Sequence, residues 1–347
     1  MGYERVEWAG DGEAGCVAGL DLGKAELSCC VQQGDPGHPG GVSQHVSTWS
    51  TMTGALTELA GMLVTAGVQL VAMEATSEYW KPVYFRLEAH GLNVIVVNAK
   101  HFKHLPGRPK TDKLDSQWLA RLAGKGLLRP SFVPPPDIRA LRDLTRDRAD
   151  LVDQRTANKN RVEKLLEDAC ITLSVVASDI FGVSGRAMME ALIRGERDPN
   201  ILSEMAKSSL RGKKAALVEA LTGMFTEHHG FRLRMLLDRI DALTADIAAL
   251  DRRIDQTIAP YNHQRQQLET IPGVSHVAAA ALLAEIGVDM SRFPTAGNLA
   301  SWAKYAPGVN ESAGKTTGTR STGKGNKYTA RTLGHLLSRW GCDVLMF

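Results

Sequence analysis

The first apolar positions of the chain follow the pattern of short strands. Residues 17–21 and 27–32 each combine apolar runs with alternation, and Gly23 supplies a turn between them. Residues 46–49 continue in the same way. Three strands are therefore expected near the start of the chain.

Helical and strand patterns then alternate. Residues 53–66 repeat their apolar side chains at helical spacing, and residues 78–90 are also expected to form a helix. A buried-strand run at residues 69–73 ends at Glu74, and residues 92–97 form a β-branched strand. Together with the three early strands, this order predicts an α/β domain with a mixed sheet.

Two long helices with heptad spacing are predicted in the middle of the chain. Three prolines at residues 134–136 form a stiff break, which predicts a domain boundary. The first seam runs from Leu141 to Leu165 and is interrupted by polar residues, Arg148, Arg155 and Asn158. The second seam has the regular spacing of a coiled coil; it consists of Leu236, Ile240, Leu243, Ile247, Leu250 and Ile254. The two seams either pair within one chain as a helical hairpin or join copies of the chain.

A tight turn near Gly273 lies between two segments expected to be helical. Residues 268–274 contain a Pro-Gly pair, and residues 277–286 form an apolar run. This order predicts a helix–hairpin–helix, whose turn offers backbone N–H groups to a phosphate. The alternative is an ordinary helical corner in a core. The C-terminal domain is expected to be mostly α.

Composition is that of a soluble globular protein. Of 347 residues, 44% are hydrophobic and 23% charged, and no apolar run is long enough to cross a membrane. The N-terminus lacks the apolar core of a secretory signal, and the five cysteines show neither metal-ligand spacing nor a disulfide pattern. A cytoplasmic location is expected. Four segments are predicted: an extension over residues 1–16, an α/β domain over 17–131, a coiled-coil or helical region over 137–260 and a C-terminal domain over 261–347.

Positive charge is concentrated in two stretches, although the net charge of the chain is only +3. Residues 99–131 contain eight Lys or Arg and two Asp or Glu, and residues 299–340 contain seven and one. Such local excess suits a polyphosphate partner such as nucleic acid. A solvated surface is the alternative for either stretch alone.

Four carboxylates occur where a metal site could form. Asp21 lies on the first strand, Glu74 closes a later strand, and Asp112 and Asp115 share one face at the start of a predicted helix. Converging carboxylates repel one another unless a cation joins them, and oxygen ligands of this kind suit Mg²⁺. Each acid alone could instead be a turn, surface or capping residue. The strand-Asp-turn also begins sugar kinases and actin-like ATPases, but no second glycine-rich phosphate loop follows.

The glycine-rich basic tail could carry a nucleophile. Small residues and glycines in residues 305–327 allow the backbone to approach a ligand, and the interleaved Lys and Arg neutralise phosphates. A hydroxyl in such a loop can attack phosphorus if its proton is removed. The candidates are Ser312, Thr316, Thr317, Ser321 and Tyr328. The alternative is a flexible basic loop that only binds nucleic acid.

Both ends of the chain resemble one family. The acids resemble the DEDD set of RuvC-like nucleases, which have the ribonuclease H-like fold. Gly-Leu-Asp-Leu-Gly-Lys at 19–24, Met-Glu-Ala-Thr at 73–76 and Lys-Thr-Asp-Lys-Leu-Asp-Ser at 110–116 resemble the N-terminal domain of the insertion-sequence 110 family of transposases. Ile-Pro-Gly-Val at 271–274 and Glu-Ser-Ala-Gly-Lys at 311–315 resemble its C-terminal serine transposase domain. The family pattern continues as a basic helix where this chain ends.

The resemblance implies a site-specific DNA transposase. Ser312 would form a covalent phosphoserine link with DNA, and the four acids would hold Mg²⁺ beside the phosphate. It also implies a bridge RNA that pairs with donor and target DNA, and a site shared between the protomers of a homodimer or homotetramer. The basic stretches and the predicted turn supply the expected nucleic-acid contacts: Lys110, Lys113, Gly273, Lys315, Arg320, Lys324 and Lys327.

Two other functions remain open from the sequence. The main alternative is a metal-dependent junction nuclease of the RuvC type, whose C-terminal half only binds DNA. A nucleic-acid-binding adaptor with a decayed nuclease fold is the other, and the intact set of four acids counts against it.

Overall fold

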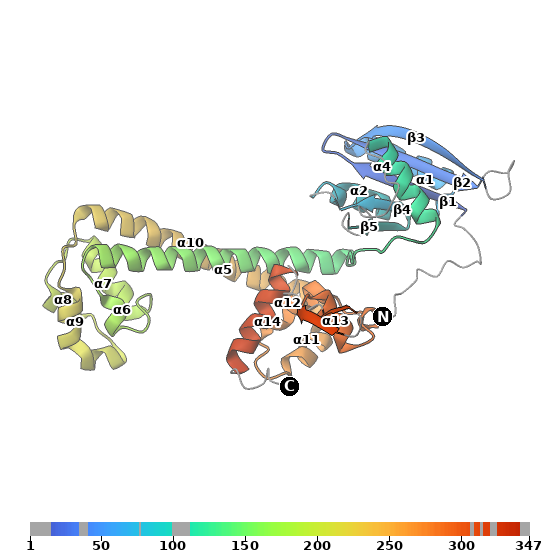
Figure 1. The fold of residues 1–347 in the computed structure, drawn as a ribbon. Helices are drawn as coiled ribbons and strands as arrows, with labels where there is room; N and C mark the ends of the chain where they lie inside the picture. The colour runs from blue at the N-terminus through green and yellow to red at the C-terminus, as the bar shows by residue number, and fades with distance from the viewer. Residues whose placement is uncertain are drawn as a thin grey trace. The chain divides into compact units, whose positions relative to one another are not determined.

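The chain folds into two compact units, residues Met1–Val133 and Pro134–Phe347. The computed structural model describes residues 15–34, 41–75, 78–98, 112–305, 309–312, 315–319 and 325–340 (Figure 1).

A five-stranded mixed sheet forms the N-terminal unit. Its strands are β1 (Cys16–Leu22), β2 (Glu26–Gly34), β3 (Val42–Ser50), β4 (Leu70–Glu74) and β5 (Val94–Val97). The order across the sheet is β3-β2-β1-β4-β5; the first three strands are antiparallel, and β4 and β5 run parallel to β1. The expected α/β class with a mixed sheet is confirmed.

Helices cover both faces of this sheet. On one face, α1 (Thr53–Thr65) and α2 (Trp80–Ala89) bury leucines against Leu20 and Met73. On the other, α4 (Asp112–Gly124) packs Ala123 and Leu119 against Val17, Ala72 and Val97. Because successive side chains of a strand point to opposite faces, residues 17, 19 and 21 of β1 and residues 70, 72 and 74 of β4 face α4.

Helix α4 lies almost in contact with the backbone of β1. A Cβ atom at Gly19 would come within 2.2 Å of the Ser116 carbonyl oxygen and 2.4 Å of the Ala120 nitrogen. Glycine is required here because any side chain would push the helix away from the strand. A buried hydrogen bond of 3.0 Å between the hydroxyls of Ser28 and Ser116 joins β2 to the same helix.

The C-terminal unit is built on an antiparallel pair of long helices, α5 (Pro136–Asp168) and α10 (Glu227–Ile258). In the second predicted seam, Ile240, Leu243, Ile247 and Ile254 are buried. The two seams therefore pack within one chain, which is the hairpin alternative. A contact between copies through this seam would have to displace α5.

The polar residues that interrupt the first seam have partners inside this hairpin. Arg148 pairs with Asp251 on α10, at 2.5 Å. Arg155 Nη1 donates to Thr244 Oγ1 at 3.5 Å, seven residues further along α5 and seven residues back along α10. Asn158 is buried and its amide donates to the Gln154 carbonyl at 2.8 Å. The polar residues of the first seam thus form hydrogen bonds, two of them from α5 to α10 and one within α5.

Short helices close the far end of the helical hairpin. They are α6 (Leu173–Val176), α7 (Val183–Ile193), α8 (Pro199–Glu204), η1 (Ser208–Lys213) and α9 (Lys214–Leu221). Glu190 on α7 accepts hydrogen bonds from Arg186 at 3.1 Å and from Arg234 on α10 at 2.5 Å. Burial raises the pKa of Glu190, but these two arginines outweigh it and leave the pKa below its ordinary value.

The remaining elements gather at the other end of the hairpin, which we call the base. They are η2 (Ala259–Tyr261), α11 (Asn262–Glu269), α12 (His276–Ile286), η3 (Met290–Arg292), α13 (Ala296–Trp302), β6 (Val309–Ser312), β7 (Lys315–Thr319) and α14 (Lys327–Trp340). Leu141 of α5 and Ile254 of α10 pack there against Ala280 and Leu283 of α12. Strands β6 and β7 pair as an antiparallel hairpin in a segment predicted to be a loop. No helix in the described part of the chain has the length and apolar character needed to cross a membrane.

Candidate functional site

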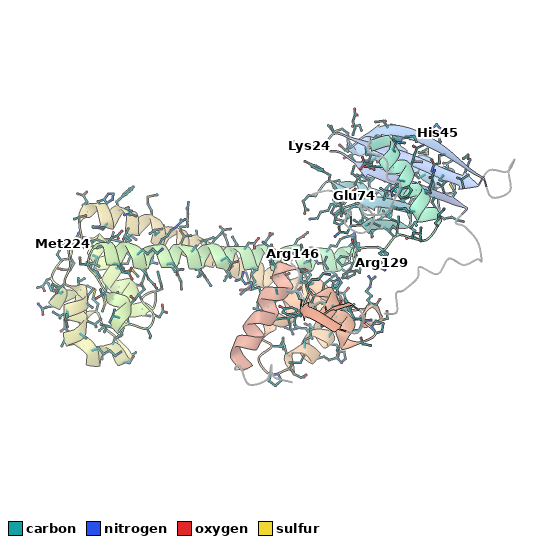
Figure 2. All side chains as sticks on the ribbon, in the orientation of Figure 1. Lys24, His45, Glu74, Arg129, Arg146 and Met224 are labelled. Carbon is teal, nitrogen blue, oxygen red and sulfur yellow. The ribbon has the colours of Figure 1, made fainter. Side chains whose placement is uncertain are left out.

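Two of the predicted acids lie side by side at the ends of neighbouring parallel strands. The pairing of β1 with β4 reaches Leu20 and Met73, so Asp21 and Glu74 occupy the next position of the same register. Both residues belong to the set of strand positions that faces α4. Glu74 is buried, with 8% of its surface exposed, and lies in the N-terminal unit in Figure 2. A buried carboxylate is stable only if donors or positive charge face it.

The other two acids begin the helix that covers this face. Asp112 is the first residue of α4, and Asp115 follows one turn later. Ser116, next to Asp115, hydrogen-bonds Ser28, and Ser28 stands directly opposite Asp21 in the pairing of β1 with β2. The structure therefore brings the first turn of α4 to the end of β1 that carries Asp21.

The chemistry of this face suits a divalent cation. Asp21, Glu74 and Asp115 offer carboxylate oxygens, the ligands that Mg²⁺ prefers. The side chain of Asp112 lies outside the described residues. Among the side chains that are described, no three acidic, histidine or cysteine groups lie close enough together to hold a metal ion. The metal site therefore stays a prediction, supported by the residue types and by their common face.

The predicted nucleophile lies at the tip of the β6–β7 hairpin. Ser312 is the last residue of β6, and its backbone pairs with that of Lys315, the first residue of β7. Ser312 and Lys315 are thus the paired residues at the end of the hairpin where β6 stops and β7 starts. The side chains of this hairpin are not among the described ones, and its register places a lysine opposite the serine.

The other hydroxyl candidates differ in their positions. Thr316 and Thr317 lie in β7, whereas Ser321 lies outside the described residues. Tyr328 is on α14, where its hydroxyl donates to Asp150 Oδ2 at 3.0 Å. This bond occupies the Tyr328 hydroxyl with a contact between α14 and α5.

Of the predicted nucleic-acid contacts, Gly273 and Lys327 have described surroundings. Gly273 has a φ of 84° and forms the turn between α11 and α12. Lys327 begins α14, 3.5 Å from Asp150, and its ammonium lies over the Tyr328 ring. The other side chains lie outside the described set: Lys110, Lys113, Lys315, Arg320 and Lys324.

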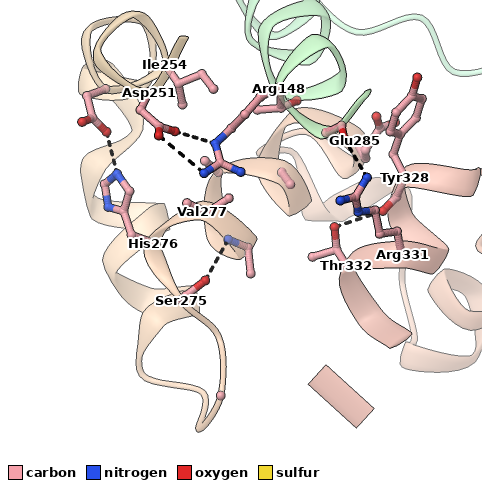
Figure 3. A pocket seen from close by; sticks show the side chains of 17 residues that line it. Arg148, Asp251, Ile254, Ser275, His276, Val277, Glu285, Tyr328, Arg331 and Thr332 are labelled. Carbon is pink, nitrogen blue, oxygen red and sulfur yellow. Dashed lines mark hydrogen bonds and ion pairs between the residues drawn. The ribbon is translucent and has the colours of Figure 1, made fainter. Parts of the chain in front are cut away.

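A cavity of about 590 Å³ opens between the hairpin helices, α12 and α14 (Figure 3). Its wall includes Gly273 and the start of α12, where the Ser275 hydroxyl accepts a hydrogen bond from the Ala278 amide at 3.3 Å. His276 follows, with Nε2 2.5 Å from Asp255 Oδ1. The turn at Gly273, which was predicted to bind a phosphate, therefore lies at the edge of a pocket. One backbone N–H group beside it, that of Ala278, is already bonded to Ser275.

Arginines in this pocket were not singled out from the sequence as site residues. Arg148, paired with Asp251, lines one side. Arg331 of α14 lines another and pairs with Asp153 at 2.7 Å. The sequence signal for both is weak. Arg148 belongs to a helix in which acids and bases alternate, and Arg331 is one of three Lys or Arg residues in a helix without acids.

Both ends of the chain match families of known proteins. Residues 18–171 match the IS110 DEDD family, described as a transposase. Residues 265–339 match the family described as transposase IS116/IS110/IS902. The first match contains all four predicted acids, and the second contains Ser312.

Two relatives and one solved structure are similar to the chain. The "Insertion element IS116 uncharacterized 44.8 kDa protein" of Streptomyces clavuligerus is 29% identical over 251 residues, which are 67% of this chain and 62% of the relative. The "Transposase for insertion sequence element IS1111A" of Coxiella burnetii is 24% identical over 273 residues, 77% of this chain and 65% of the relative. The chain thus spans less than two thirds of either relative. The RuvC structure of Thermus thermophilus covers 33% of this chain and 99% of its own, at 16% identity and a TM-score of 0.26.

Proposed function

Because the chain belongs to the IS116/IS110/IS902 family of transposases, we propose that it is a DNA recombinase that cuts and rejoins strands at the ends of a mobile element. One observation supports this function most directly. Asp21 and Glu74 end adjacent parallel strands on the face that the first turn of α4 covers. Acids in this arrangement suit phosphoryl transfer.

In the proposed reaction Ser312 attacks a DNA phosphate. Its hydroxyl proton passes to a base or to solvent, and a bond forms between Oγ and phosphorus. The bond from phosphorus to the leaving deoxyribose oxygen breaks, and that oxygen takes up a proton. The phosphoserine link conserves the energy of the broken bond, so that the hydroxyl of another strand can reverse the same steps.

Asp21, Glu74, Asp112 and Asp115 are the proposed ligands of Mg²⁺. A bound divalent ion stabilises the charge that develops on the phosphate oxygens. The contribution of the chain is to hold four carboxylates on one rigid face, where strand ends and a helix start fix their backbones. Asp21 and Glu74 are positioned by the sheet, and the other two by α4.

Target choice and assembly complete the proposal. Phosphate contacts position a protein on DNA but do not read its sequence. A bound bridge RNA that pairs with donor and target DNA would supply that reading, as base pairing does in guided nucleases. Ser312 and the acids belong to different compact units, and we propose that a homodimer or homotetramer assembles them into shared sites.

A denaturing gel of the full chain with end-labelled element DNA, guide RNA and Mg²⁺ tests the chemistry. The wild type should form a covalent protein–DNA adduct, and Ser312→Ala should abolish it while Ser321→Ala, the matched control, retains it. Asp21→Ala or EDTA should reduce the adduct by orders of magnitude. Metal-dependent cleavage that is unchanged in Ser312→Ala would instead establish the junction-nuclease alternative. Omitting the RNA tests guidance separately, since site-selective recombination by an RNase-treated sample would exclude it.

A further inference from the structure

The base contains a buried carboxylate held by arginines. Glu285, near the end of α12, has 2% of its surface exposed. Arg146 of α5 binds it with two hydrogen bonds, Nε to Oε1 at 2.7 Å and Nη2 to Oε2 at 2.9 Å. Arg142 lies 3.6 Å from the same carboxylate and donates to the carbonyls of Ala284 and Glu285, each at 2.9 Å. A charge this deeply buried is stable because the arginine fork satisfies it.

A third group on Glu285 comes from the segment that follows the β6–β7 hairpin. The side-chain amide of Asn326 donates to Glu285 Oε2. The amide oxygen of Asn326 accepts from the backbone N–H groups of Tyr328 at 2.9 Å and Thr329 at 3.4 Å, so that Asn326 also caps α14. One side chain therefore ties the start of α14 to the buried carboxylate.

The segment that precedes the hairpin is attached to the same place. The Tyr305 hydroxyl donates to the carbonyl of Ala330 at 3.0 Å. A Cβ at Gly325 would come within 2.5 Å of the Ala303 carbonyl oxygen, so the two flanks of the hairpin approach as closely as their backbones allow. Described residues that precede the hairpin, Ala303 and Tyr305, are thus in contact with residues that follow it, Gly325 and Ala330.

Helix α14 in turn is fixed on α5. Arg331 Nη1 donates to the Ala149 carbonyl at 2.8 Å, and the Arg146 guanidinium lies 4.9 Å from the centre of the Tyr328 ring. Burial lowers the pKa of Arg146, but hydrogen bonds and charge from Glu285 reverse this effect and leave the pKa raised. Arg146 therefore stays charged and contacts both Glu285 and α14.

We propose that Glu285, acting through Asn326, is a positioning residue for the β6–β7 hairpin and hence for Ser312 at its tip. The part that concerns Ser312 rests on the proposed function. A nucleophile on a two-stranded hairpin gains reactivity when the segments that hold the hairpin are rigid, because less motion must be frozen in the transition state. The described residues before and after the β6–β7 hairpin meet at Ala303 and Gly325. Glu285 joins Asn326, the residue after Gly325, to Arg146 on the long helix α5.

Hydrogen exchange of the full chain tests the proposal without requiring activity. Glu285→Gln removes the charge, and Asn326→Asp keeps an acceptor that can cap α14 while losing the donor to Glu285. Both variants should speed exchange of the β6–β7 amides by about tenfold or more, because the local opening free energy falls. Glu190→Gln is the matched control. Glu190 is also held by two arginines, but it lies at the far end of the α5–α10 helical hairpin, away from β6 and β7. This control should speed exchange in α7 and leave β6–β7 unchanged.

Three results separate the possible failures. Unchanged β6–β7 exchange in Asn326→Asp and in folded Glu285→Gln would overturn the positioning role. Faster exchange without a fall in the rate of adduct formation would overturn its link to Ser312; we expect that rate to fall about tenfold while the Kd for DNA changes less than about threefold. Absence of any adduct in the wild type would refute the proposed function and leave the exchange result to decide the role of Glu285.

Discussion

Replacing Gly19 with alanine should separate α4 from the sheet. The added Cβ would lie 2.2 Å from the Ser116 carbonyl oxygen, 2.4 Å from the Ala120 nitrogen and 3.0 Å from the Leu119 Cβ. Two of these three atoms belong to the helix backbone, which cannot rotate away as a side chain can. Helix α4 must therefore move from β1 by about 1 Å, since ordinary contacts of a carbon atom are about 3.5 Å or longer.

The expected destabilisation can be estimated from two opposing effects. Overpacking of this kind costs about 1–3 kcal/mol, and contact with backbone favours the upper end. Alanine also restricts the unfolded chain, which returns about 0.4–1 kcal/mol. Gly19 does not have the positive φ seen at Gly67 and Gly91, so backbone strain adds nothing. A net loss of about 1–2.5 kcal/mol should lower the Tm of the N-terminal unit by roughly 3–10 °C.

Differential scanning calorimetry of the full chain measures this change, with Gly61→Ala as the control. Gly61 lies within α1, and a Cβ there meets nothing within 4 Å. Alanine at Gly61 should stabilise the unit by about 0.5–1 kcal/mol through its higher helix propensity. A Gly19→Ala variant with an unchanged Tm, or one that forms the DNA adduct at the wild-type rate, would show that the contact of α4 with β1 is not a constraint on the site.

Three further predictions concern the hairpin, a titratable residue and the cysteines. Ile247→Lys should destabilise the C-terminal unit by about 3 kcal/mol or more, because a buried seam position would receive an unpaired charge; Phe231→Lys, at a 67% exposed position of the same helix, should change stability by less than about 0.5 kcal/mol. A lower oligomeric state of Ile247→Lys with undiminished helicity, by light scattering and circular dichroism, would contradict packing within the chain. The pKa of Glu190 is lowered in the folded chain, so its stabilising effect is complete above the ordinary pKa and is lost as the pH falls through the lowered value. The Tm difference between wild type and Glu190→Gln should therefore shrink between about pH 6 and pH 3. A Tm difference that grows over this range would refute the sign of the effect. Burial raises the pKa of the Cys29 thiol to about 12, so iodoacetamide at about pH 8 should label exposed Cys170 and leave Cys29 unmodified in the folded chain, as mass spectrometry of the peptides would show.

Much of the secondary structure of the N-terminal unit could be predicted from the spacing of its apolar residues. The helix predicted to start at Asp112 is observed as α4, and the expected strands at residues 17–21 and 27–32 lie within β1 and β2. Strand β3 begins at Val42, four residues before the predicted strand. This start was not predicted because most residues from 42 to 45 are polar and most are exposed at the sheet edge. An edge strand buries too little to impose an alternating apolar pattern.

Other features depend on contacts that no local pattern contains. A heptad seam has the same spacing whether its partner is another copy or α5 of the same chain, so the sequence left both open. The β6–β7 hairpin is rich in Gly and Thr and lacks apolar alternation. Glu285 is a single acid in an apolar helix, and its meaning becomes visible only when Arg142 and Arg146, one turn apart on α5, are seen to face it.

The antiparallel register of α5 and α10 also makes the length of the hairpin adjustable. Each step along α5 is matched by an equal step back along α10, as the Arg148 and Arg155 contacts show. Removing about seven residues from each helix at facing positions keeps the seam in phase, whereas shortening only one helix would rotate every later side chain out of it. The loop at Gly195, which is exposed and open around its Cα, offers an attachment point for a fluorescent or affinity domain. The α5–α10 hairpin can thus be shortened, or carry an added domain at its far end, while the base, with Glu285 and α14, keeps its packing.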